Sequence, residues 1–143
     1  AGWRAGPLAR VLCIALVASL LLAAVEVRLS PRHAKDDDRA AAGVADAAAA
    51  GGQRVWWAAN PSTARYYGVD FAGAPRSARP GAVLFMANAA PESTLSLAPP
   101  DLIILCKPEN YDRLGGLTAV VEQRRFIQQA RLPGFTIWRR PQP

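Results

Sequence analysis

The chain has 143 residues, of which 51% are hydrophobic and 8% are aromatic, and its formal net charge is +6. This length allows one soluble domain of ordinary size and excludes a complete multi-pass membrane enzyme. The aromatic and hydrophobic content argues against intrinsic disorder. The sequence does not begin with Met, and we expect it to be a piece of a longer protein.

The positive charge is concentrated at the two ends of the chain. Residues 1–35 and residues 107–143 each carry a net charge of +4, whereas residues 36–106 carry −2. The sequence contains no arginine-rich helix and no recognisable DNA- or RNA-binding motif. We therefore expect no nucleic-acid partner. Basic chain ends suit anionic headgroups, and membrane lipid is the partner that we predict.

The first element is a long apolar segment. Residues 11–25 contain no charged side chain, and residues 8–29 give 22 residues when the flanks are included. A helix of this length extends about 33 Å, which is enough to cross a hydrocarbon core of about 30 Å. Arg10 and Glu26 would then lie near the two interfaces, with Trp3 as an aromatic anchor. We interpret residues 1–29 as a transmembrane helix and its flanks.

Two other interpretations of this segment stay open. An uncharged run of 15 residues that contains the small residues Ala23 and Ala24 also fits a cleaved signal peptide, and a buried helix of a soluble protein can have the same composition. Basic residues flank both ends of the segment, so the positive-inside rule does not give its orientation.

The two cysteines are predicted to remain unpaired with each other. Cys13 lies in the apolar run and Cys106 lies in a later hydrophobic strand, and a thiol inside a bilayer cannot reach a thiol of a soluble domain. Two isolated cysteines and one histidine, His33, do not make a zinc site. We expect His33 to be a solvated linker residue, and we predict no metal site.

Residues 30–52 are predicted to form a polar linker and an alanine-rich helix. Pro31 ends the first helix, and residues 36–38 are three consecutive aspartates. Acidic residues stabilise a helix start and the glycines at 51–52 stop the helix, so we predict a helix over about 36–50. The aspartates also contain the D-x-D pattern with which sugar-nucleotide transferases hold a metal ion. The helix start explains them without a metal.

Residues 53–143 are predicted to form a small α/β domain. Apolar runs bounded by Pro and Gly are typical of strands that are buried on both faces, as in parallel sheets. Pro-Gly between two such runs is typical of a hairpin turn. The expected elements are a strand at 53–59, a short helix at 61–67 that Asn60 or Ser62 caps, a loop at 68–81, strands at 82–86 and 101–106, a helix after Gly115-Gly116, and a hairpin at 126–138.

The predicted fold class is therefore α/β: one N-terminal transmembrane helix followed by a small three-layer, mostly parallel sheet domain that ends in an antiparallel hairpin. The predicted domain organisation is 1–29 for the membrane helix, 30–52 for the linker and alanine-rich helix, and 53–143 for the α/β domain.

The sequence contains no nucleotide-binding, nucleophile or zinc-protease motif, so we predict no catalytic residue and no cofactor. Ligands of α/β sheets bind beyond the carboxyl ends of parallel strands. Aromatic and charged groups at that position suit a sugar or a phosphate-bearing lipid headgroup. The alternative is that the aromatic residues pack in the core and that the charged ones are exposed ends. The candidate ligand-binding residues are Asn60, Arg65, Tyr66, Lys107, Glu109 and Tyr111.

Three segments of the chain carry a resemblance to a known family. They are residues 35–42 (KDDDRAAA), residues 53–61 (QRVWWAANP) with Tyr66-Tyr67-Gly68, and residues 100–112 (PDLIILCKPENYD). Together they resemble the tail of bacterial multi-pass glycosyltransferases of the GT-C class, which are similar to the dolichyl-phosphate-mannose-protein mannosyltransferases. The resemblance implies a last transmembrane helix followed by a small extracytoplasmic domain. It also implies a location in the inner membrane, with residues after about 30 outside the cytoplasm.

The same resemblance implies a role without catalysis. In that class the catalytic acid lies in an early extracytoplasmic loop, and the donor is a polyprenyl-phosphate-linked sugar. No segment here matches that loop. The chain would then be the non-catalytic C-terminal portion of such a transferase, which caps the membrane region or aids acceptor recognition and meets donor or acceptor only through the full-length protein. The alternative is a single-pass, membrane-tethered binding or scaffolding domain with no enzymatic activity.

Overall fold

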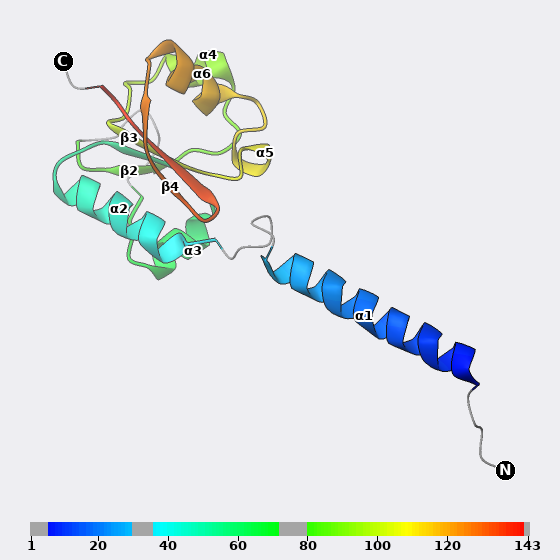
Figure 1. The fold of residues 1–143 in the computed structure, drawn as a ribbon. Coiled ribbons are helices and arrows are strands. Elements are labelled where there is room, and N and C mark those ends of the chain that lie inside the picture. The colour runs from blue at the N-terminus through cyan, green and yellow to red at the C-terminus, as the bar shows by residue number, and fades with distance from the viewer. Residues whose placement is uncertain (1–5, 30–35, 72–79, 142–143) are drawn as a thin grey trace. The chain divides into compact units, whose positions relative to one another are not determined.

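The computed structural model of the chain describes residues 6–29, 36–71 and 80–141 (Figure 1). It divides into two compact units, residues 1–35 and residues 36–143. The expected linker with His33, the expected anchor Trp3 and most of the expected loop at 68–81 lie outside the described residues.

The first unit consists of one helix, α1 (Pro7–Leu29), and the sequence prediction of an apolar helix here is confirmed. Its segment Pro7–Glu26 has a mean hydropathy of 2.6, and none of it is buried against other parts of the described chain. The hydroxyl of Ser19 donates a hydrogen bond of 2.8 Å to the carbonyl oxygen of Ala15, so this polar group is satisfied inside the helix. By length and composition α1 can cross a membrane, and a signal sequence meets the same criterion.

The second unit contains a five-stranded sheet in the order β2-β1-β3-β5-β4. Strand β1 pairs in parallel with both β2 and β3, and β5 pairs antiparallel with both β3 and β4. The sheet is therefore mixed rather than mostly parallel, because the predicted C-terminal hairpin joins it through β5. The strands are β1 (Val55–Ala58), β2 (Val83–Phe85), β3 (Leu102–Cys106), β4 (Ile127–Leu132) and β5 (Phe135–Arg139).

In the described part of the second unit, five helices accompany the sheet. They are α2 (Asp38–Ala50), α3 (Pro61–Tyr66), α4 (Pro91–Leu95), α5 (Pro108–Tyr111) and α6 (Gly116–Gln123). The predictions of α2, α3 and α6 are confirmed. The sequence analysis missed α4 and α5, which have five and four residues. Each of these two begins with proline, whose fixed φ suits the first turn, but neither is long enough to show a helical period.

One face of the sheet is covered by α2, whose buried residues are all alanines. Ala41, Ala45 and Ala48 recur at helical spacing and pack against Trp57, which also contacts the ring of Phe135 at a centroid distance of 5.8 Å. Alanine has no side chain beyond Cβ, so the helix can lie close to these large rings. The alanine-rich helix thus contributes to the core of the second unit, residues 36–143.

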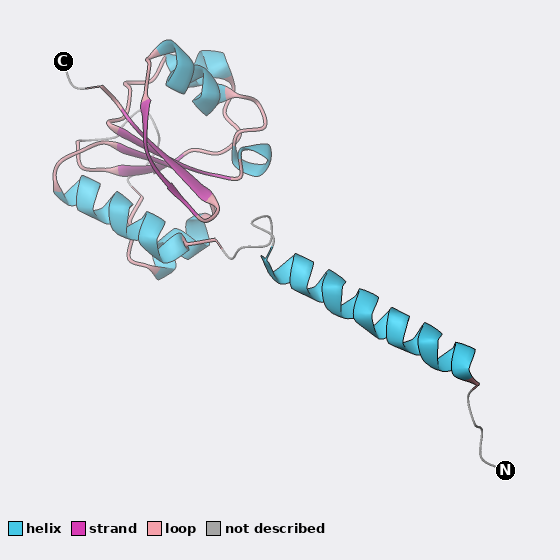
Figure 2. Ribbon diagram, in the orientation of Figure 1, coloured by secondary structure: helices cyan, strands magenta, loops and turns pink. Residues whose placement is uncertain are grey.

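The opposite face of the sheet packs against α6 and α4 (Figure 2). Leu117 and Val120 of α6 form a buried cluster with Trp56 and Ile103. Successive side chains of a strand point to opposite faces, so Trp56 and Trp57 enter different halves of the core. They are 1% and 0% exposed, and the packing interpretation of these two rings is confirmed.

The start of α6 is fixed by a buried carboxylate and by close backbone contact. Asp112, which is 6% exposed, accepts hydrogen bonds of 2.9 Å from the backbone N–H groups of Leu117 and Thr118. These donors have no partner within the helix, so they stabilise the buried charge. A Cβ at Gly116 would collide with the backbone oxygen of Ala89 and lie 2.6 Å from Thr94 Oγ1. This position therefore requires glycine.

The variant Gly116→Ala is expected to lower the free energy of unfolding by about 1–3 kcal/mol, because the added methyl group has no space and the contact is with backbone. The control is Gly43→Ala in α2, where a Cβ meets nothing within 4 Å. There alanine is expected to stabilise the protein by about 0.5–1 kcal/mol through helix propensity. Thermal melts of the full chain in detergent measure both shifts. Equal shifts in the same direction would contradict the crowding at Gly116.

Candidate functional site

The candidate residues follow the strands β1 and β3, which are neighbours in the sheet. Ala58 of β1 lies in register with Leu105 of β3, and the strands are parallel. The segments that follow them, from Asn60 and from Lys107, therefore start at the same edge of the sheet. We call this edge, where β1, β2 and β3 end, the carboxyl edge.

On the β1 side, the candidate residues have local structural partners. The side-chain oxygen of Asn60 accepts a hydrogen bond of 2.9 Å from the N–H of Ser62 and caps α3. The guanidinium of Arg65 lies 5.7 Å from the ring centroid of Phe71. Tyr66 is 82% exposed and touches Tyr67 edge to face at 5.0 Å, so Tyr66 is a surface residue and not a core residue.

On the β3 side, Lys107 forms an ion pair that the sequence analysis did not predict. Its Nζ lies 2.5 Å from Oδ2 of Asp36, and this hydrogen bond raises the pKa of Lys107. Lys107 has the left-handed φ of +42° and precedes Pro108, the first residue of α5. Asp37, the next aspartate along, accepts a hydrogen bond of 3.0 Å from the N–H of Ala40 and caps α2. Two of the three aspartates in the D-x-D pattern therefore serve the fold.

The titratable groups next to this pair keep their protons at neutral pH. Burial, followed by the negative charge of Asp36, raises the pKa of the Cys106 thiol to about 11. The Sγ atom of Cys106 lies 4.0 Å from Oδ2 of Asp36. Burial also raises the pKa of the Tyr111 phenol. A nucleophilic cysteine needs a lowered pKa and a general base needs a pKa near the working pH, so neither group is prepared for catalysis.

The remaining candidates lie around α5. Hydrogen bonds of Asn88 connect this helix to the segment that follows β2. Tyr111 is half-buried, whereas Glu109 is exposed and its backbone oxygen accepts a hydrogen bond from Arg113 Nε. Asn88, at a left-handed φ of +51°, donates from its side chain to the backbone oxygen of Asn110 and accepts from the N–H of Arg113. The sequence analysis missed Asn88, although it follows the predicted strand at 82–86 closely.

The six candidate residues thus form two groups on one edge. Among the described residues, no hydrogen bond or ion pair links Asn60, Arg65 or Tyr66 to the residues around α5. Lys107, Glu109 and Tyr111 are close together because they lie within five consecutive residues after β3. We find that the first group occupies the α2 and α3 side of the edge.

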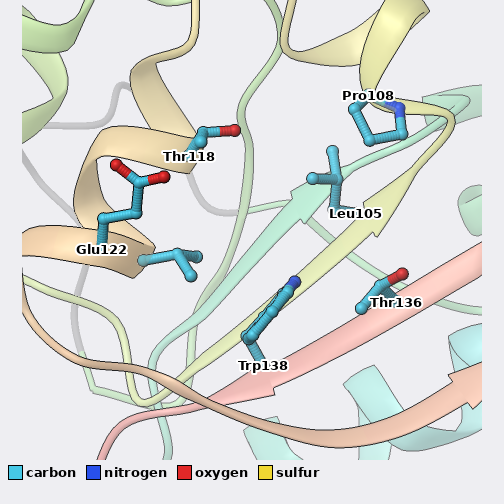
Figure 3. A pocket seen from close by; sticks show the side chains of 7 residues that line it. Leu105, Pro108, Thr118, Glu122, Thr136 and Trp138 are labelled. Atoms are coloured by element: carbon cyan, nitrogen blue, oxygen red, sulfur yellow. The ribbon is translucent and has the colours of Figure 1, made fainter.

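A cavity of about 260 Å³ lies on the α6 face of the sheet (Figure 3). Thr118 and Glu122 face it from α6, while Thr136 and Trp138 face it from β5. The Thr118 hydroxyl donates to Asp112, so toward the cavity it can only accept a hydrogen bond. The lining residues are Leu105, Pro108, Thr118, Val121, Glu122, Thr136 and Trp138.

None of the six candidate residues lines this cavity, and the sequence analysis missed it. The sequence contained a weak signal for this cavity. Thr118 and Glu122 are four apart on a helix, and Thr136 and Trp138 are two apart on a strand, so each pair lies on one face of its element. The walls are largely aliphatic and aromatic, with hydroxyl and carboxylate groups beside them. This arrangement can receive a small ring with polar substituents.

Within the described part of the chain, no group of three or more His, Cys, Asp or Glu side chains could hold a metal ion. Both cysteines are free thiols. Comparisons with protein-family models, with curated proteins and with solved structures found no match.

The protonation state of Cys106 generates a prediction about alkaline stability. The folded-state pKa of about 11 lies above the ordinary value of 9.0, so the folded protein holds this proton more tightly than the unfolded chain. The resulting stabilisation is complete below pH 9 and is lost as the pH rises toward 11. Urea denaturation between pH 8 and pH 11 is expected to show a falling free energy of unfolding. In Cys106→Ala this decline is expected to be shallower, and an equal slope in both proteins would contradict the assignment.

Proposed function

We propose that the chain is the non-catalytic C-terminal portion of a multi-pass membrane glycosyltransferase that uses a polyprenyl-phosphate-linked sugar. The observation that carries the membrane part is α1, whose 20-residue segment Pro7–Glu26 has a mean hydropathy of 2.6 and no buried surface in the described chain. An apolar helix followed by a separate α/β unit is also the order of elements that the family resemblance implies. In this proposal α1 spans the inner membrane and residues after about 30 are extracytoplasmic.

The carboxyl edge supports a role without chemistry. Lys107 is held by Asp36, Asn60 caps a helix, and the pKa of Cys106 lies near 11. A catalytic centre needs a nucleophile with a base beside it, or a pair of carboxylates with separated pKa values. No such pair occurs among the described residues of this edge. Capping the membrane region or aiding acceptor recognition needs no such group.

We infer a three-layer architecture for the domain that would do this. Helix α2 packs against one buried cluster of the sheet and α6 packs against the other, which supports two helical layers with a sheet between them. A body with a core on both faces is rigid enough to hold a surface in a fixed orientation. The cavity beside Trp138 is the place that we propose for contact with an acceptor.

The second candidate function is a single-pass, membrane-tethered binding domain that has no enzyme attached. The cavity favours it, because the 260 Å³ beside Trp138 lies wholly within residues 36–143 and needs no other part of a transferase. The two candidate functions predict different sequences upstream of Ala1 in the gene. About ten further hydrophobic spans and an acidic first loop upstream of Ala1 support the transferase, and a start codon directly before Ala1 supports the tethered domain.

The chain by itself is expected to transfer no sugar, because it lacks a catalytic pair of residues in its described part. The measurement is a transfer assay with the full chain in phospholipid vesicles, a polyprenyl-phosphate-linked mannose and a peptide acceptor. Heat-denatured chain gives the background. Turnover clearly above that background would overturn the non-catalytic assignment. Recovery of the chain in the vesicles after a sodium carbonate wash tests the membrane assignment independently.

A further inference from the structure

The exposed large hydrophobic residues of the second unit are unevenly distributed. Of the five among its described residues, three are aromatic and lie on or next to α3 and β2: Tyr66 at 82%, Tyr67 at 36% and Phe85 at 39% exposed. Water-exposed aromatic rings that gather in one place are unusual for a soluble surface and indicate a contact with another phase or molecule.

Two arginines stack on these rings. The guanidinium carbon of Arg39 lies 5.8 Å from the centroid of Tyr67, and that of Arg65 lies 5.7 Å from the centroid of Phe71. Phe71 in turn contacts Phe85 at 6.1 Å. Among the described residues neither arginine forms a hydrogen bond or an ion pair. A guanidinium stacked on a ring keeps its N–H edge free, and that edge matches the oxygens of a phosphate.

These residues lie where the polypeptide enters the domain. Asp36 is paired with Lys107 at the end of β3, and the N–H of Asp37 donates a hydrogen bond of 2.9 Å to the backbone oxygen of Pro133. Arg39 stands in the first turn of α2, and Tyr67 contacts it. The first residues of the domain and the exposed tyrosines therefore share the carboxyl edge.

The length of the connecting chain restricts where this edge can be. Six residues separate Leu29, the last residue of α1, from Asp36. Seven steps of fully extended chain span at most about 25 Å. If α1 crosses a bilayer, Asp36 can lie no further than this from the end of the helix. The lipid surface is thus the nearest large partner for rings that emerge beside Asp36.

We propose that the surface formed by Arg39, Arg65, Tyr66, Tyr67 and Phe85 docks on the phospholipid headgroups. We call it the docking surface. The rings enter the interfacial region, where an apolar ring with a polar hydroxyl is favoured, and the guanidinium groups bind lipid phosphates. This inference rests on the proposed membrane function of α1.

The charge near the docking surface specifies which lipid is needed. Asp38 and Asp70 belong to the same segments as the two arginines, so cations and anions balance and no excess positive charge remains. Docking is therefore driven by the aromatic rings, with phosphate contacts in addition. Phosphatidylcholine, which is zwitterionic, is expected to suffice. Added salt is expected to have little effect because salt screens interactions between charges and not the burial of the aromatic rings.

The test places a fluorophore at each of two positions in the full chain with Cys13→Ser. Ser62→Cys is exposed on α3, one turn before Tyr66, whereas Ala98→Cys is exposed just before β3, at the opposite edge of the sheet. Cys106 is buried and does not compete for the label. The chain is inserted into phosphatidylcholine vesicles that contain a nitroxide lipid in the headgroup region. Quenching is expected at position 62 and not at position 98.

Two substitutions separate docking from mere proximity. Tyr66→Ser, at a position 82% exposed, is expected to keep the fold and to lose most of the quenching at position 62. The matched control is Ile127→Ser on β4, which removes a 62% exposed hydrophobic side chain away from the docking surface and is expected to leave the quenching unchanged. A thermal melt of each variant confirms that the domain is folded.

The outcomes distinguish the docking surface from the anchor. A chain that resists a carbonate wash but shows no quenching at position 62, or equal quenching at both positions, overturns the docking inference and leaves α1 as an anchor. Quenching that survives in Tyr66→Ser also overturns it. A chain that the wash removes from the vesicles overturns the membrane assignment together with the docking that rests on it.

Discussion

Strand β1 has no face toward water, and the arrangement of the domain follows from this. Its four residues are all buried, and its neighbours β2 and β3 pair with it on both sides. Adjacent tryptophans, Trp56 and Trp57, project in opposite directions from it, so each face of the sheet needs its own cover. Two indole rings bury several hundred square ångströms of apolar surface together. Without α2, or without α6, one of the two rings would be exposed to water.

Helices α2 and α6 cover the two faces of the sheet in different ways. On the Trp57 side, the buried residues of α2 are all alanines, so the ring itself fills the space between helix and sheet. On the Trp56 side, α6 contributes Leu117 and Val120 and stands on a buried carboxylate, Asp112. That second helix has only eight residues. The cavity beside Trp138 lies between this helix and β5.

The sequence was sufficient for the elements whose signal is local. Apolar runs between Pro and Gly identified β1, β2, β3 and the hairpin, and aspartates before a run of alanines identified α2. The sequence did not indicate that the hairpin would join β3 through β5, because strand order depends on contacts between distant residues. It also did not show the pair of Asp36 and Lys107, which are 71 positions apart. The three aspartates also match a metal-binding pattern. The predicted helix start accounted for them, and the structure adds the ion pair of Asp36 with Lys107.

The candidate residues were chosen because they follow two apolar runs, which are the strands β1 and β3. These strands pair in parallel, so the segments from Asn60 and from Lys107 start at one edge of the sheet. Asn60 was one of two helix caps predicted from the sequence, and it is the cap of α3. The sequence could not show that Lys107 forms an ion pair with Asp36. Whether an aromatic residue is core or surface was equally undetermined: Trp57 is fully buried and Tyr66, nine positions later, is almost fully exposed.

The attachment of the first residues of the domain has a mechanical consequence. Asp36 is paired with Lys107 and the N–H of Asp37 is bonded to Pro133 before α2 starts. A force applied to the polypeptide from its N-terminal side therefore acts first on this ion pair and this hydrogen bond. Through them it acts on the end of β3 and on the hairpin turn. As long as these two contacts persist, the force does not act on α2. A pull on the chain before Asp36 would reach the sheet through one ion pair and one hydrogen bond from a backbone N–H to a carbonyl oxygen, so these two contacts would resist detachment of the first residues of the domain.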